Sequence, residues 1–367
     1  MPVDDRAPAA EDQITVTGTA QQRAWHDHLL PPVEQVRPGL WSVPTPFTNS
    51  PLRYVLAYLL ETERGPVLVD TGWPSADAWD GLVAGVAATG HAITEIAAVL
   101  VTHFHADHFG LANQVRETSG AWVGMHPADA AILSDFPGRD GWADEDRAWM
   151  KLRGVPASEL DALMPPAGFT MQHHRGRGVD VLIEDGGRPL GKDVPLRALW
   201  TPGHTPGHLC FADERYDVLL TGDHILPRIS PNISPAPGGG NEDTLGVYLG
   251  SLAAMEDLDP DEVLPAHEYR FAGLPVRVRQ LLEHHRARLG EVVDVVGAAD
   301  GCSTLEVAER LTWSRPWAQS QGLVRRSAIG ETYAHLLHLE RKGIVSNSEN
   351  PGDHWSVVAN ARPDSHN

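Results

Sequence analysis

Residues 102–108 read THFHADH, which places His103, His105, Asp107 and His108 within seven positions. In an extended segment alternate side chains point to the same face, so His103 and His105 can bind one metal ion. Asp107 and His108 come where the chain must turn toward a helix, within reach of a second ion. Imidazole nitrogens and carboxylate oxygens are typical ligands of zinc, which binds them at ~2.0–2.2 Å. The spacing therefore predicts a metal site.

Three later motifs supply the further ligands that two coordination shells need: His204 in TPGH, Asp223 in TGDH and His267 in PAHE. Five neutral histidines and two carboxylates around two divalent ions would leave a locally positive site, even with one hydroxide bound. Such a site favours substrates with an anionic or electron-rich group. Because metal coordination lowers the pKa of water to ~7, a metal-bound hydroxide can act as the nucleophile without any serine or cysteine.

The elements that must position these residues are short apolar runs, which alternate with amphipathic stretches. Several of the runs end in a residue with ligand chemistry, as strands that lead into one site would. The pattern predicts an α/β fold. The expected strands are 54–60, 66–70, 96–101, 121–126, 196–200, 208–212, 217–223 and 262–267.

Together with LVDTG at 68–72, these motifs resemble the metallo-β-lactamase superfamily, particularly its glyoxalase II-like hydrolase branch. The resemblance covers roughly residues 40–275 and implies an αββα sandwich of four layers with a dinuclear metal site at one edge. It implies that His103, His105 and His204 bind the first ion. Asp107, His108 and His267 would bind the second, and Asp223 would bridge both. Asp107 and Asp223 are also the expected catalytic residues. Ligand type favours zinc, with iron and manganese as alternatives.

Four neighbours of the motifs are candidates for supporting roles. Asp70 resembles the aspartate with which the family supports its metal ligands from outside, and a turn cap is the alternative. His208 is expected to form hydrogen bonds in the core behind the ligands. His224 either supports the ligands and lines the pocket or simply packs. Arg270 is a candidate for binding a substrate carboxylate or phosphate, with a surface salt bridge as the alternative.

Four regions are expected along the chain: a flexible tail at 1–20, a hydrolase domain at 21–275, within it an insertion at 127–190, and a helical region at 276–367. The insertion either covers the site or packs elsewhere on the sheet as a helical layer. Helical patterns at 303–313 and 328–343, followed by a small β-wing, resemble the winged-helix-like appendage of the LACTB-type branch. The alternatives for this region are a helical brace or a homodimer contact.

Composition limits the classes of function. A net charge of −20 disfavours nucleic acid as a partner, because lysine and arginine supply most phosphate affinity. The chain has no apolar run of 18 residues and no basic, apolar leader, so we expect a cytoplasmic protein without a membrane partner. Cys210 and Cys302 are expected to be buried thiols. The pairs His173/His174 and His284/His285 lie outside every motif and are expected to face solvent.

The sequence thus favours a metal-dependent hydrolase that acts through a metal-bound hydroxide on a small thioester or ester. The expected partner is a small acyl substrate. A single-stranded RNA endoribonuclease of the LACTB type is the alternative, and the near-neutral charge of residues 301–345 argues against it. The complete ligand set disfavours a binding module without catalysis.

Overall fold

The computed structural model describes residues 13–48, 50–135, 142–164, 178–235, 242–348 and 352–358. By its internal contacts the chain divides into two units. The first comprises Met1–Pro137, Met171–Pro231 and Leu252–Gln280, and the second Gly138–Thr170, Asn232–Ser251 and Leu281–Asn367. The expected domain boundaries stay predictions.

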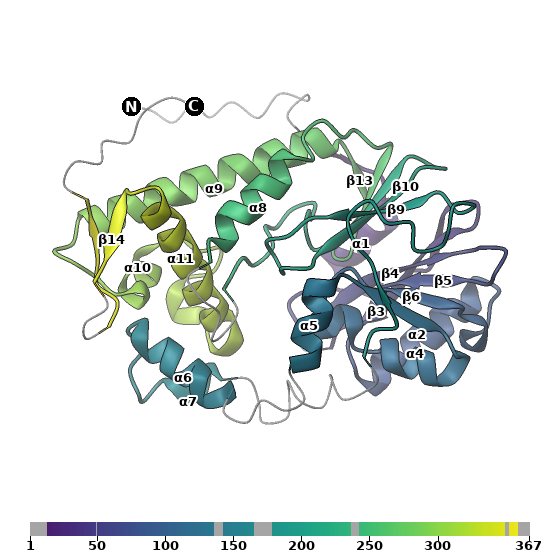
Figure 1. Ribbon diagram of the computed structural model, residues 1–367, viewed down its shortest axis with the longest axis horizontal. Coiled ribbons are helices and arrows are strands. Elements are labelled where there is room, and N and C mark those ends of the chain that lie inside the picture. The colour runs from purple at the N-terminus through teal and green to yellow at the C-terminus, as the bar shows by residue number, and fades with distance from the viewer. Residues whose placement is uncertain are drawn as a thin grey trace. The chain divides into compact units, whose positions relative to one another are not determined.

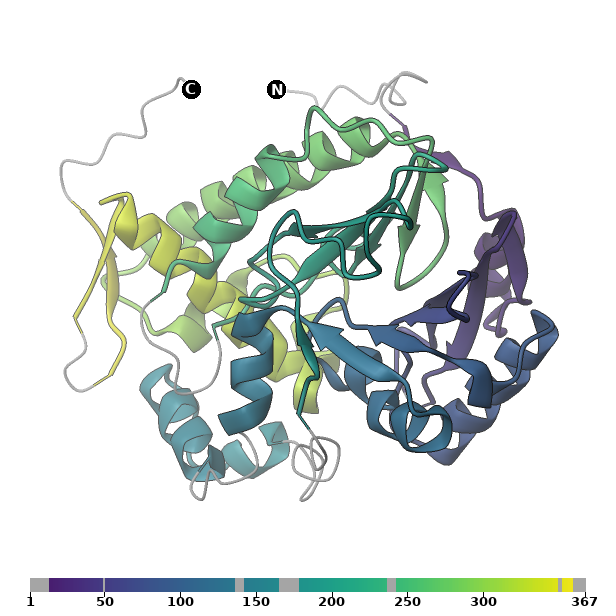
Figure 2. The ribbon, with the colours of Figure 1, turned by 45° about the vertical axis from the view of Figure 1, so that its right-hand side comes forward.

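Among the described residues, the first unit contains two mixed β-sheets (Figures 1 and 2). One has the order β2-β3-β4-β5-β6-β7-β8: its first four strands are antiparallel, and β5 to β8 are parallel. Its strands are β2 (Glu34–Arg37), β3 (Leu40–Pro46), β4 (Tyr54–Leu60), β5 (Val67–Val69), β6 (Ala98–Leu100), β7 (Trp122–Met125) and β8 (Val181–Leu182).

The other sheet has the order β1-β13-β12-β11-β10-β9, in which only the pair β11 and β12 is parallel among the described strands. Its strands are β1 (Thr15–Val16), β13 (Phe271–Ala272), β12 (Glu262–Pro265), β11 (Val218–Gly222), β10 (Leu209–Asp213) and β9 (Leu196–Trp200). The expected tail at 1–20 lies largely outside the described residues, although Thr15 and Val16 pair with β13 and α1 (Thr19–Asp27) begins before residue 20.

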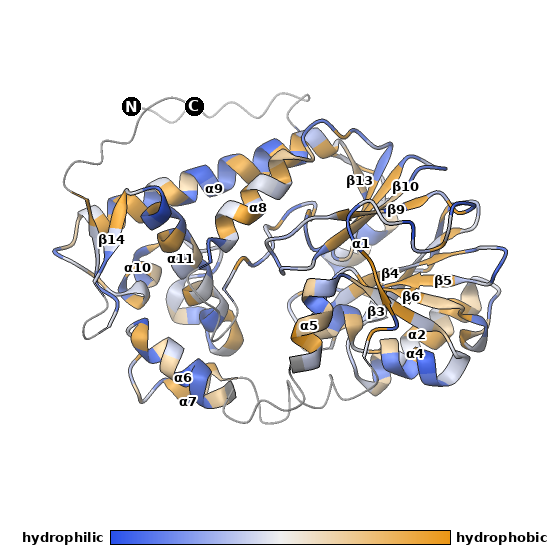
Figure 3. Cartoon of the chain, viewed as in Figure 1, coloured by the Kyte–Doolittle hydropathy of each residue, from blue (hydrophilic) through white to orange (hydrophobic). Residues whose placement is uncertain are grey.

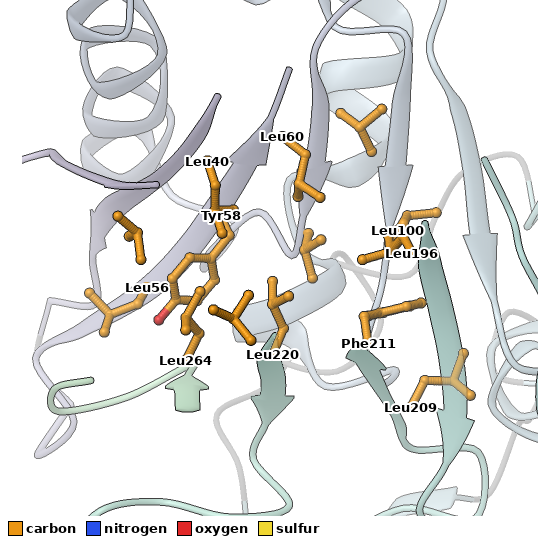
Figure 4. Close-up of a cluster of buried hydrophobic side chains, with 14 of the residues drawn as sticks. Leu40, Leu56, Tyr58, Leu60, Leu100, Leu196, Leu209, Phe211, Leu220 and Leu264 are labelled. Atoms are coloured by element: carbon orange, nitrogen blue, oxygen red, sulfur yellow. The ribbon is translucent and has the colours of Figure 1, made fainter. Parts of the chain in front are cut away.

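The two sheets pack face to face over one apolar core. Leu40, Leu56 and Tyr58 from the first sheet meet Phe211, Leu220 and Leu264 from the second, and all are almost fully buried (Figure 4). The alternation of side chains along each strand sends every second residue into this core. The expected α/β sandwich of two sheets is confirmed.

Helices cover the outer face of the β2–β8 sheet. Val43, Leu68 and Val99 on the strands form a second core cluster with Leu82 of α2 (Ala76–Ala88) and Val115 of α4 (Ala112–Ser119). Ser75 caps α2 by accepting a hydrogen bond from the amide of Ala78. Ala112 and Val115 form the buried face of α4, and Figure 3 shows hydrophilic residues on the rest of this helix. The short helix α3 (Ala106–Phe109) and α5 (Pro127–Asp135) follow β6 and β7.

The second unit is mostly helical and has a core of its own, which includes Trp149, Val292, Leu336 and Trp355. Its elements are α6 (Trp142–Leu152), α7 (Leu160–Leu163), α8 (Thr244–Ala253), α9 (Leu274–Gly297), α10 (Thr304–Arg310), α11 (Gly322–Arg341), β14 (Val345–Asn347) and β15 (Trp355–Val357); α8 and α9 each extend into the first unit. The expected helices and hairpin are present, but α11 begins six residues before the expected start at 328. A winged-helix arrangement stays a prediction.

Two expectations about single residues have different outcomes. Cys210 and Cys302 are both buried free thiols, as predicted. The expectation that His285 faces solvent is wrong, because the residue is 0% exposed, and its Nδ1 lies 3.2 Å from Nε2 of His335. His173 and His174 lie outside the described residues. None of the described helices combines the length and hydropathy that a membrane crossing requires.

Candidate metal centre

The predicted ligands all lie in the first unit and follow the carboxyl ends of strands. His103, His105, Asp107 and His108 come after β6, His204 after β9, Asp223 directly after β11 and His267 after β12. Parallel strands end at the same edge of a sheet, and β11 and β12 are a parallel pair. The packing of the two sheets therefore brings together side chains that are up to 164 residues apart in sequence, His103 and His267.

Three histidine nitrogens meet at one point. Nε2 of His103 lies 3.0 Å from Nδ1 of His105, and Nε2 of His204 lies 3.1 Å from the same nitrogen. Two donors that each lie ~2.0–2.1 Å from a tetrahedral ion are about 3.3 Å apart. The spacing of these nitrogens is close to that of ligands around one zinc ion.

The second group combines carboxylates and imidazoles. Nε2 of His108 lies 3.6 Å from Oδ2 of Asp107 and 3.5 Å from Oδ1 of Asp223. Nε2 of His267 lies 3.5 Å and 3.3 Å from the same two oxygens. Oδ2 of Asp223 lies 3.5 Å from Nε2 of His204. Asp223 thus faces both groups with different oxygens, as a bridging carboxylate would.

Asp70 fixes the ring of His108. Its Oδ2 lies 2.8 Å from Nδ1 of His108, while the amide and hydroxyl of Thr102 donate to its oxygens. Since that hydroxyl donates to Asp70, it can accept from Nδ1 of His103 at 3.0 Å. Both rings therefore turn Nε2 toward the site, which is how metal-binding histidines are usually oriented. Thr102 is a contributor that sequence reasoning missed, although it directly precedes the first ligand.

The ring of His267 is held by the main chain. Its Nδ1 lies 3.0 Å from the carbonyl oxygen of Tyr54, which can only accept, so Nδ1 carries the proton and Nε2 faces the carboxylates. The hydroxyl of Tyr54 in turn donates to the carbonyl of Glu268 at 2.6 Å. Glu268 follows the ligand directly and has φ 68°, a left-handed conformation that is uncommon outside glycine.

Burial and neighbouring charge set opposite protonation in the two groups. Burial, aided by neighbouring imidazoles, lowers the pKa of His103 and His105, that of His105 to about 3, so both rings are neutral at pH 7. Burial also acts to lower the pKa of His108 and His267, but Asp223 and Asp107 outweigh it and raise both, His267 to about 10. Without an ion, protons thus occupy the second group.

The buried atoms of the cluster fit divalent ions. Among the described residues, Nε2 of His108, Nε2 of His267 and Oδ1 of Asp223 are buried and make no hydrogen bond. Buried polar atoms are rarely left in this state, and an ion is one of the partners that satisfies them. The donors form three overlapping groups, and within each group the donor atoms lie within 4.8 Å of one another. Together the three groups contain all seven predicted ligands. The cluster therefore has the residue types, spacing and orientation of a metal site.

His208 and His224 lie behind the ligands, and neither is exposed. Nδ1 of His208 lies 2.8 Å from the hydroxyl of Thr201, and its Nε2 accepts a hydrogen bond from the amide of Asp223 at 3.2 Å. Gly222, at φ 50°, allows this approach, because a Cβ there would lie 2.8 Å from Nε2 of His208. His208 thus positions the backbone of Asp223, the predicted bridging residue.

Arg270 lies in a buried ion-pair network. Its guanidinium contacts Glu262 at 2.5 Å and Glu34 at 3.1 Å, and the residue is only 7% exposed. This geometry favours the salt-bridge alternative, although the pair is buried rather than on the surface. A role in substrate binding stays a prediction without support from these contacts.

Known proteins are similar to this chain in sequence and in fold. The lactamase-like protein adaB of Aspergillus niger is 26% identical over 285 residues, which cover 74% of this chain and 71% of that protein. An atrochrysone carboxyl ACP thioesterase of Aspergillus chevalieri is 25% identical over 271 residues, 73% of this chain and 68% of the relative.

The crystal structure of a metallo-beta-lactamase family protein from Thermus thermophilus superposes with a TM-score of 0.76 at 27% identity, covering 88% of this chain and 100% of the other. The sequence model of the family described as the metallo-beta-lactamase superfamily matches residues 50–267. This segment begins before Asp70 and ends on His267. Since this match spans more than half of the chain and includes all seven predicted ligands, the chain belongs to the metallo-beta-lactamase superfamily.

Proposed function

We propose that this chain is a dinuclear metal-dependent hydrolase that cleaves a small thioester or ester. One observation carries the proposal: Asp223 lies between two groups of donors and turns Oδ2 toward His204 of one and Oδ1 toward His267 of the other. As in the predicted ligand set, His103, His105 and His204 would hold one ion, and Asp107, His108 and His267 the other. The named thioesterase activity of one relative supports an acyl substrate.

When bound, the two ions would supply a water of lowered pKa and polarise the substrate carbonyl. The chain's own residues determine where this chemistry occurs. The side chains of Asp107 and Asp223 are 14% and 11% exposed, whereas those of His108 and His267 are fully buried. The cluster therefore opens to solvent on its carboxylate side. Asp107 would orient the attacking water there through the carboxylate oxygen that does not face His108 and His267.

The test is a substrate screen with the protein purified with its native metal. Acyl-CoA thioesters, simple esters, lactones, phosphodiesters and short single-stranded RNAs would be compared before and after chelation. We expect hydrolysis of a thioester or ester that chelation removes and added metal restores. His103→Ala should abolish it, while His91→Ala, a change at a histidine near Glu61 and Glu95 outside the cluster, should not.

Single-stranded RNA is the substrate in this screen that distinguishes the proposed hydrolase from a ribonuclease. Salt-sensitive RNA cleavage without any thioester or ester turnover would overturn the proposal in favour of the ribonuclease alternative. Hydrolysis that persists unchanged after chelation and in His103→Ala would exclude the metal site as the catalytic centre.

A further inference from the structure

The helix α5, which follows β7 at the start of the expected insertion, carries one fully buried carboxylate. Asp129 is 0% exposed, and its oxygens accept three hydrogen bonds. Oδ2 accepts from the amide of Phe104 at 3.0 Å and from the hydroxyl of Thr205 at 2.8 Å, and Oδ1 accepts from the amide of Gly207 at 2.6 Å. All three partners are neutral donors, so this carboxylate belongs to no ion pair with them.

The partners of Asp129 lie on two segments that carry the first group of histidines. Phe104 stands between His103 and His105, and Thr205 directly follows His204. These segments leave different sheets, because β6 belongs to the β2–β8 sheet and β9 to the other. The three histidine nitrogens of the first group therefore meet only if two separate loops are held in fixed positions relative to each other.

Asp129 packs closely against Gly207, on the segment that follows His204. A Cβ at Gly207 would lie 2.6 Å from the amide nitrogen of Asp129 and 2.7 Å from its Oδ1, so only glycine fits there. One backbone hydrogen bond, from Leu209 to the carbonyl of Thr102, also joins the two segments. Asp129 adds three hydrogen bonds to this link, and two of their partners, Phe104 and Thr205, are directly adjacent to predicted ligands.

We infer that Asp129 is a positioning residue: its carboxylate ties the loop of His103 and His105 to the loop of His204 and so sets the geometry of the first metal site. The inference rests on the proposed metal site. Removal of groups that orient metal ligands typically weakens metal binding ~10–100-fold.

The experiment measures stepwise zinc dissociation constants by competition with a chromophoric chelator. Asp129→Asn keeps the shape but turns an amide NH2 toward groups that are themselves donors. We expect one of the two zinc ions to bind ~10–100-fold more weakly, with the other changed far less. Asp213→Asn is the matched control, because Asp213 is a buried aspartate of the same unit that instead bonds Arg215. It should leave both constants unchanged.

A gentler variant covers the case in which Asp129→Asn does not fold. Thr205→Val removes only the 2.8 Å hydrogen bond and keeps the side-chain shape. It should weaken the same ion by a smaller factor. Where Asp129→Asn does fold, Thr205→Val should add little to it, because the two residues act through one contact.

The outcomes separate the inference from the proposed function. If both variants lower the melting temperature of the metal-free protein but leave both zinc constants unchanged, Asp129 is merely structural and the inference is wrong. If the unaltered protein binds no zinc, iron or manganese, the metal site itself fails, and the inference fails with it.

Discussion

Oδ2 of Asp70 lies 2.8 Å from Nδ1 of His108, and the opposite nitrogen of the same ring faces Asp107 and Asp223. The backbone of Asp70 has φ 60°, in the left-handed region. A non-glycine residue in that region is strained by ~1–3 kcal/mol and persists where its surroundings hold it in place. Here the strained turn after β5 places the carboxylate against Thr102 and His108 at once.

Asp70→Asn should weaken metal binding at the second group. The amide nitrogen cannot accept from Nδ1–H of His108, so the ring loses the contact that fixes its tautomer and orientation. We expect ~10–100-fold weaker binding of one ion, which titration of the metal-free protein with zinc would measure. Asp80→Asn, on the exposed side of α2, is the control that should behave like the unaltered protein. Equal zinc affinity in all three proteins would contradict the supporting role of Asp70.

Leu336→Ala should destabilise the second unit without touching the ligands. Leu336 is 0% exposed in α11 and packs in the core cluster with Trp149 and Trp355. Removing a buried leucine typically costs ~2–5 kcal/mol through lost burial and the cavity that remains. Urea unfolding followed by tryptophan fluorescence would measure the loss. Zinc content should stay at the value of the unaltered protein, because all seven predicted ligands lie in the first unit.

The sequence allowed much of the candidate site to be predicted, for a physical reason. Each ligand lies a few residues after an apolar run at most, so its place at a strand end is local information. Asp129 had the same kind of signal, because it follows β7, which is parallel to β6 and ends at the same edge. What was missing is the knowledge that its carboxylate reaches Gly207, a residue 78 positions away.

A long-range partner explains the difference at Arg270. Arg270 lies three residues after a predicted ligand, but its contact Glu34 is 236 residues away, and no local pattern reveals that pairing.

The burial of His285, in contrast, had a local signal in the sequence. Leu281, His285 and Val292 recur at i, i+4 and i+11 on one face of α9, and all three are buried. An isolated histidine on an apolar helical face is a core residue by periodicity.

His208→Ala and His103→Ala should differ in their effects on metal content and on melting temperature. His103→Ala removes a predicted ligand, so we expect loss of one ion per chain and of turnover. His208→Ala removes the acceptor of the Asp223 amide and leaves that buried amide without its partner, which costs ~1–3 kcal/mol before any cavity effect. We therefore expect a lower melting temperature with zinc content close to that of the unaltered protein. Elemental analysis and thermal unfolding decide the case, and equal metal loss in both variants would make His208 a ligand.

Zinc binding should release protons from His108 and His267, the two imidazoles of the second group. Carboxylate neighbours raise the pKa of His108 and His267, the latter to about 10, so in the metal-free protein both rings are protonated at pH 7.5. Asp107, with its pKa lowered to about 2 because the effect of His108 and His267 exceeds that of burial, is already ionised and releases none. His103 and His105 have lowered pKa values and are neutral.

The two rings of the second group must lose their protons to bind an ion, so they should release about two protons per chain when zinc binds at pH 7.5. A metal-bound water of pKa ~7 would add up to one more. Each displaced proton makes the affinity about tenfold weaker per unit fall in pH, so the ion held by His108 and His267 should lose about 100-fold per unit. Calorimetric titrations in buffers of different ionisation enthalpy give the proton count directly. His267→Gln should lower the count by about one. Release of no protons at pH 7.5 would show that the second group is already neutral and open to metal, contrary to the charges that surround it.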